Sequence, residues 1–190
     1  MLSVVGSESI ESEDAMIDAM TARQTAIYYL GLAELVETRL AASLRYAAAV
    51  HGLDGAWQWV ERQDISGAAL ADMVSDEDAG GVYGAMAVEE RADLLPVWGC
   101  VAMGVAFASY AASLSEGKTM RQIREDIHGV DSEDSHDEFA RWFQTLIPLT
   151  TVRSHYEAAM DDLFTGEVTR SATRDCAFAA LHAAAADSGA

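Results

Sequence analysis

The feature that most constrains the fold is a segment without any charged residue, LLPVWGCVAMGVAFASYAASL, from Leu94 to Leu114. A helix of this length can cross a bilayer, or it can be the buried centre of a water-soluble protein. Pro96, Gly99 and Gly104 make it a poor lipid-facing segment, and acidic residues flank both ends without a basic bias that would orient it. Because a helix that is apolar all round is buried on all sides in a soluble fold, we predict a central helix over 94–114 and no membrane contact.

Side chains of this segment also sort by size around a helix. Small residues follow one face and bulky residues another: Gly99, Ala102, Ala106 and Ser109 against Met103, Phe107, Tyr110 and Leu114. The small face allows the backbone of a neighbouring helix to come close.

Elsewhere, apolar residues recur at intervals of three and four, and strand-like alternation is not evident. The sequence therefore predicts an all-α fold, an irregular bundle of about six to seven helices around the central helix. We expect one helical domain over 1–190, with flexible ends at 1–12 and 185–190.

The predicted helix boundaries rest on capping and breaking residues. The first long helix is expected to begin near the acidic residues 8–14 and to end at Gly52, with Glu34 and Glu37 off its apolar stripe. Pro148 should divide the helical pattern near the C-terminus. Two pairs with capping-box spacing predict helix starts, Thr119 with Gln122 and Ser135 with Glu138.

Charge is strongly unbalanced, since 31 acidic residues face 12 basic ones and the net charge is −19. Self-repulsion of this size destabilises a compact state unless ions screen it. We therefore expect screening cations and interpret the composition as that of a halophile's protein, with a GC-rich mesophile as the alternative. The same charge argues against nucleic acid, because phosphate binding needs clustered basic residues.

Two observations indicate the cellular compartment of the protein. Cys100 and Cys176 are too few for a disulfide framework, and both lie in apolar sequence. The N-terminal residues lack a basic segment followed by an apolar one, so no secretory signal is expected. The predicted location is the cytoplasm, or a virion assembled there.

Two Glu-x-x-His pairs are the candidate metal ligands, Glu125 with His128 and Glu133 with His136. On a helix this spacing places a carboxylate and an imidazole on one face, as carboxylate-bridged metal bundles require. The pairs are separated by Gly129 and an acidic loop, so they could form one mononuclear site. The simpler interpretation is a helix-end histidine and a solvated helix start, and no cofactor is predicted.

Trp57 and Trp59 are candidate interface residues, because they straddle a helix and one ring could be exposed to a protein partner. Two buried rings are the favoured alternative. With no catalytic constellation in the sequence, the predicted function is a non-enzymatic helical structural or assembly subunit. It would form a homo-oligomer or join a larger particle, such as a virion or connector of a halophilic archaeon's virus. The alternatives are a metal-binding helical protein, a helical enzyme whose pocket a single sequence does not show, and a cytoplasmic helical chaperone or adaptor.

Overall fold

A computed structural model describes residues 20–75, 80–126 and 133–189, with the backbone alone at 124–126 and 133–134. These residues form nine α-helices and no strand, so the all-α prediction is confirmed, although six to seven helices were expected. The helices are α2 (Ala22–Glu37), α3 (Tyr46–Arg62), α4 (Gly67–Ser75), α5 (Val82–Ala87), α6 (Leu95–Ser115), α7 (Met120–Asp126), α8 (Glu133–Leu146), α9 (Val152–Thr165) and α10 (Arg170–Ser188). A 3₁₀ turn, η1 (Thr38–Ala42), follows α2.

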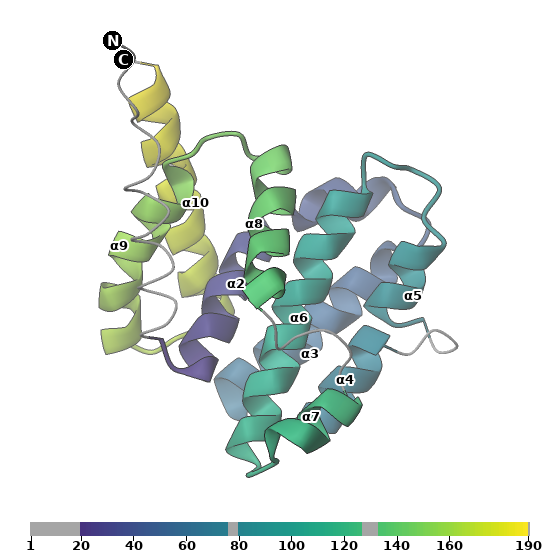
Figure 1. Cartoon of the computed structure of the whole chain (residues 1–190). Helices are drawn as coiled ribbons and strands as arrows, with labels where there is room; N and C mark the ends of the chain where they lie inside the picture. The colour runs from purple at the N-terminus through teal and green to yellow at the C-terminus, as the bar shows by residue number, and fades with distance from the viewer. Residues whose placement is uncertain (1–19, 76–79, 127–132, 190) are drawn as a thin grey trace.

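Helix α6 is the centre of the bundle, as Figure 1 shows. It packs against α2, α3, α4, α5 and α8, and every residue from 97 to 109 is buried. By length and composition α6 is apolar enough to cross a membrane, but 89% of its most apolar window is buried inside the protein. The predicted central helix is therefore confirmed.

Glycines of α6 are positions of close helix approach. A Cβ added at Gly104 would lie 3.4 Å from the Tyr29 carbonyl oxygen of α2. A Cβ at Gly99 would overlap the indole of Trp142 on α8. The Trp142 ring can lie this close to α6 only because Gly99 lacks a side chain, whereas a Cβ at Gly104 would make an ordinary van der Waals contact. For Gly99 this agrees with the small face predicted from sequence.

The predicted first helix is divided, which corrects the boundary at Gly52. Helix α2 begins after a capping box formed by Thr21 and Gln24, and a break at Ser43, whose backbone is extended, separates η1 from α3. Helix α3 then continues through Gly52 to Arg62, because that glycine packs directly against Val82 and Val105 instead of ending the helix. The acidic residues 8–14 lie outside the described residues.

Later boundaries agree better with the predictions. The Thr119 amide donates to Gln122 Oε1 at 2.9 Å at the start of α7, as expected. Helix α8 ends at Leu146 and α9 begins at Val152, so Pro148 does separate two helices. The second predicted cap is wrong, because Ser135 is buried within α8 rather than preceding it.

Helices α9 and α10 form an antiparallel pair that packs on α2 at one edge of the bundle (Figure 1). The rings of Tyr28 and Tyr156 stack with their centroids 5.5 Å apart across this contact. Gly31 leaves the space that the Tyr156 hydroxyl occupies. Helix α10 continues to Ser188, so the predicted flexible end at 185–190 is largely helical here. Flexibility of that end remains a prediction, and residues 1–12 lie outside the described part of the chain.

Candidate protein-binding site

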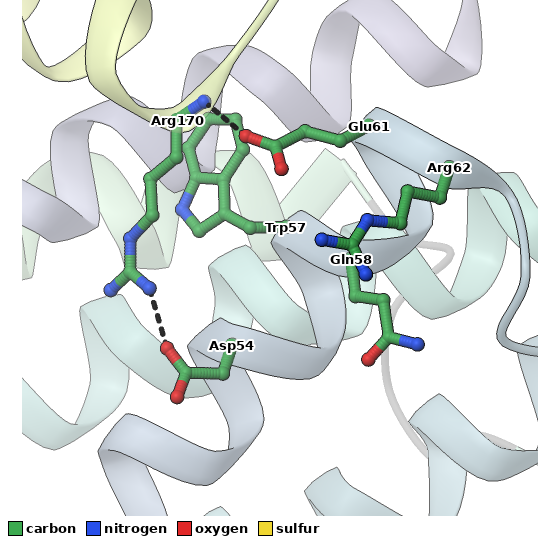
Figure 2. Close-up of a pocket in the computed structure, with 6 residues that line it drawn as sticks. All are labelled: Asp54, Trp57, Gln58, Glu61, Arg62 and Arg170. Atoms are coloured by element: carbon green, nitrogen blue, oxygen red, sulfur yellow. Dashed lines mark hydrogen bonds and ion pairs between the residues drawn. The ribbon is translucent and has the colours of Figure 1, made fainter.

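An open pocket lies where α3 meets the first turn of α10, and its volume is about 240 Å³. Figure 2 shows that its charged and amide groups come from one face of α3 and from the start of α10. The lining residues are Asp54, Trp57, Gln58, Glu61, Arg62 and Arg170. Helical spacing accounts for the α3 members, since positions 54, 58 and 61 recur at four and three.

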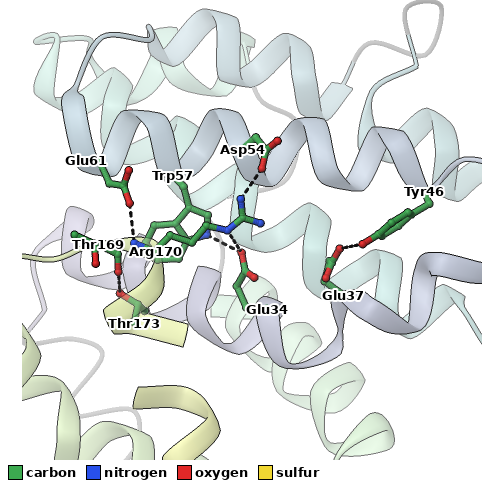
Figure 3. Close-up of polar contacts among 9 residues, drawn as sticks. All are labelled: Glu34, Glu37, Tyr46, Asp54, Trp57, Glu61, Thr169, Arg170 and Thr173. Atoms are coloured by element: carbon green, nitrogen blue, oxygen red, sulfur yellow. Dashed lines mark hydrogen bonds and ion pairs between the residues drawn. The ribbon is translucent and has the colours of Figure 1, made fainter. Parts of the chain in front are cut away.

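Arg170 is the centre of the polar contacts. Its Nε donates to Glu34 Oε1 at 2.7 Å, and its Nη1 lies 2.5 Å from Asp54 Oδ1. Its backbone amide, at the open N-terminal end of α10, donates to Glu61 Oε1 at 2.8 Å. One residue therefore links α10 to carboxylates of both α2 and α3 (Figure 3). Thr169 supports this placement by capping α10 through the Ala172 amide.

Electrostatic effects at Arg170 oppose one another. Burial lowers the pKa of its guanidinium, but the hydrogen bond to Asp54 and the charge of Glu34 raise it more, so the net pKa shift is upward. The guanidinium therefore stays charged at every accessible pH.

Glu34 is a charged residue inside the core, with 1% of its surface exposed. Its Oε1 accepts from the Trp57 indole nitrogen at 2.9 Å as well as from Arg170. A buried carboxylate is tolerated when it is paired and hydrogen-bonded in this way. The expectation that Glu34 and Glu37 lie off the buried stripe is wrong, because α2 is buried on all sides between α6 and α10.

Glu37, one turn further along α2, accepts a short hydrogen bond from the Tyr46 hydroxyl of α3 (Figure 3). This hydrogen bond, together with burial and the charge of Glu37, raises the pKa of Tyr46 to about 12. The two carboxylates of α2 thus fix both α3 and α10.

The exposed side of this site has a limited chemistry. Asp54, Gln58, Glu61 and Arg62 are exposed along α3, and the pocket lining contains carboxylates, an amide, guanidinium groups and an indole but no hydroxyl, thiol or imidazole. Such a surface can form ion pairs and hydrogen bonds with another macromolecule.

Most of the predicted metal ligands fall outside what the structure describes. His128 lies in an undescribed segment, and the side chains of Glu125 and Glu133 are not described. The fourth residue, His136, is half-buried on α8, with its Nδ1 2.5 Å from the Tyr29 hydroxyl. Among the described residues no three potential ligands gather, and the metal site remains a prediction.

Both candidate interface tryptophans are buried in the chain's own core. Trp57 is 2% exposed and Trp59 is 3% exposed. The favoured alternative of two buried rings therefore describes the structure, while contact of either residue with a partner stays a prediction. Burial also raises the pKa of Cys100, so its thiol remains protonated in the core.

Sequence reasoning missed the pocket residues Asp54, Glu61 and Arg170, as well as their buried partner Glu34. One signal was present, because Glu34 and Glu37 are the only charged residues in the otherwise apolar stretch 26–37. Charged residues surrounded by apolar ones on all sides of a helix need a buried partner. Nothing in the sequence identified that partner as a residue so far away.

Fold and site together define a helical protein with an exposed polar pocket, between α3 and α10, that suits binding to another macromolecule. A family model described as Immunity protein Imm6 matches residues 24–146, well over half of the chain and from α2 to the end of α8. The chain therefore belongs to the Imm6 immunity protein family. No curated protein and no solved structure gave a significant match.

Members of this family are toxin-immunity proteins, which implies that the chain binds a protein partner, the toxin. They are not enzymes, which agrees with the predicted non-enzymatic role through protein contacts. The family corrects the more specific expectation of a virion or connector component, because the partner that it implies is a toxin. It gives no support to the metal-binding alternative.

Proposed function

We propose that this protein neutralises a toxin by binding it directly, and that the bound face of the toxin is basic. The observation that carries the proposal is the family match, which covers the central helix and the helices around it. Neutralisation by binding needs no reaction at the immunity protein. It needs a surface that the toxin recognises and a fold that keeps this surface rigid.

Net charge supports the basic partner. A chain of −19 repels other acidic proteins and attracts basic ones, and such attraction raises association rates most at low salt. The exposed carboxylates of Asp54 and Glu61 lie on a rigid helix, where less conformational entropy is lost on binding. We propose that this face of α3 belongs to the contact with the toxin.

The cytoplasm is the compartment that we propose for the complex. Cys100 and Cys176 are both free thiols, which suits a reducing environment. Screening cations and a halophilic source remain proposals drawn from the charge.

Growth rescue tests the proposed function. Genes for toxin domains from the source genome are expressed one at a time in a laboratory bacterium, with and without this chain. Restored growth with one toxin, followed by isolation of an equimolar complex of the two purified proteins, is the expected result. Failure to restore growth against every toxin, while the chain is soluble and folded, would refute the proposal.

A charge substitution in the pocket tests the face of α3. Gln58→Lys adds a cation beside Asp54 and Glu61, and Gln144→Lys makes the same change on the exposed surface of α8. We expect Gln58→Lys to weaken toxin binding about tenfold, equivalent to about 1.4 kcal/mol, with Gln144→Lys close to wild type. Calorimetric titration measures both, and equal effects would place the toxin on another face.

A further inference from the structure

Few large apolar side chains are exposed on the described surface, and two of them lie on neighbouring loops. Leu44 is fully exposed, at 104%, and Val88 is 51% exposed. The third, Met120, begins α7 and is less exposed than either. Leu44 lies between η1 and α3, and Val88 directly follows α5. Isolated exposed apolar residues are ordinary, but these two lie on loops that a hydrogen bond from Ser43 to Glu89 joins.

A single carboxylate holds the two loops together. Glu89 Oε2 accepts from Ser43 Oγ at 2.6 Å and from the Trp98 indole at 3.2 Å. Its other oxygen accepts from the Arg91 amide at 3.1 Å. Ser43 precedes Leu44 and Glu89 follows Val88, so the hydrogen bonds fix the backbone on which both apolar residues stand. Because Trp98 is buried in α6, its hydrogen bond to Glu89 also ties the two loops to the core.

The exposed side chain of Leu44 does not contribute to the packing of this chain. Its side chain buries no surface within the molecule, whereas most large apolar side chains of the described residues are buried. Burial against a partner would remove the whole of that surface from water, and a prefixed loop reduces the ordering cost of doing so.

We infer that the surface formed by Leu44 and Val88 is an apolar anchor that inserts into the toxin. The inference rests on the proposed function and adds the place of contact. Both residues lie within residues 24–146, the segment that the family model matches. The surface also continues into the exposed face of α3, where Asp54 and Glu61 lie.

Charge favours a toxin over a second copy of this chain as the occupant of this surface. Two copies, each of net charge −19, repel each other at close range. A toxin with a basic surface around an apolar pocket is attracted by the same charge. Leu44 and Val88 would add buried apolar area to the complex. The surrounding carboxylates would orient the toxin and raise its association rate.

Substitution of the anchor tests this inference with the toxin domain recovered by growth rescue. Leu44→Asp places a charge at the centre of the surface, and Leu44→Ala removes the side chain without adding charge. Ala68→Asp adds the same carboxylate at an exposed position on α4 and serves as the matched control. Because Leu44 is fully exposed, all three variants should match the wild-type urea midpoint within error.

We expect the Kd for the toxin to rise about tenfold with Leu44→Ala and 100-fold or more with Leu44→Asp, about 1.4 and 2.7 kcal/mol, with Ala68→Asp near wild type. Equal affinities for Leu44→Asp and Ala68→Asp would overturn the inference and leave the proposed function intact. Loss of a dimer in light scattering, with toxin binding unchanged, would overturn it in favour of self-association. Absence of any complex with the wild-type chain would overturn both.

Discussion

Replacing Arg170 by methionine should destabilise the fold more than removing the charge of Asp54 or Glu61, its exposed partners on α3. Methionine keeps most of the aliphatic length but removes both ion pairs. Glu34, 1% exposed, would keep only the Trp57 indole as a partner. The contact of the Arg170 backbone amide with Glu61 would remain, because it belongs to the main chain.

The magnitude follows from how deeply each pair is buried. Removing one partner of a fully buried ion pair costs about 3–5 kcal/mol. The Arg170 side chain is 32% exposed and Glu34 retains one hydrogen bond, so we expect about 2–4 kcal/mol for Arg170→Met. The exposed pair with Asp54 adds little to this value. Most of the effect therefore comes from the unpaired charge of Glu34.

Urea denaturation with a double-mutant cycle measures this effect. Arg174→Met on the same helix removes an exposed guanidinium that lies 5.5 Å from the Phe178 ring, and should cost no more than about 1 kcal/mol. Glu34→Gln combined with Arg170→Met should recover part of the loss, with a coupling energy of at least about 1 kcal/mol. Stability of Arg170→Met within about 0.5 kcal/mol of wild type, or additive effects of the two substitutions, would refute the reasoning.

Three further predictions concern packing, titration and salt. Gly67→Ala should destabilise the fold by about 1–3 kcal/mol in urea, because its Cβ would lie 2.6 Å from the Ser113 backbone nitrogen. Gly189→Ala, with no such contact closer than 3.7 Å, should not destabilise it. Glu37→Gln should return the pKa of Tyr46 from about 12 toward 10, as seen by NMR titration of the tyrosine ring carbon. Since that pKa is raised in the folded state, its stabilising effect is present below pH 10 and lost as pH rises toward 12. Raising KCl from 0.1 M to 2 M should raise the Tm if screening stabilises the fold, and an unchanged Tm would remove the halophilic interpretation.

Local patterns were enough to predict the helical class and the centre of the fold. An uncharged stretch as long as 94–114, with acidic flanks and interrupting glycines, has few stable positions in a soluble protein other than the core. Pro148 and the Thr119 cap act through their immediate neighbours, so their effects could be predicted. The break at Ser43 could not, because Leu44 continues the apolar spacing of the helix before it while lying fully exposed.

The candidate site depends on contacts between distant parts of the chain. Arg170 and Glu34 are 136 positions apart, and neither residue belongs to a recognisable motif. Spacing can show that a carboxylate such as Glu34 needs a partner, but choosing among the chain's basic residues requires the packing of α2 against α10. The anchor at Leu44 is equally invisible, since exposure of an apolar residue is a property of the folded chain.

The distance in sequence between Glu34 and Arg170 also has a consequence for synthesis on the ribosome. Helix α2 emerges early, but the cation that neutralises its buried carboxylate is made only after α9, with most of the chain already outside. Until then the Glu34 carboxylate of α2 has no Arg170 to pair with, so the nascent chain cannot bury α2 in its native packing. A ribosome stalled just before residue 170 should therefore hold a collapsed but loosely packed chain, and native packing should follow only after α10 has left the exit tunnel.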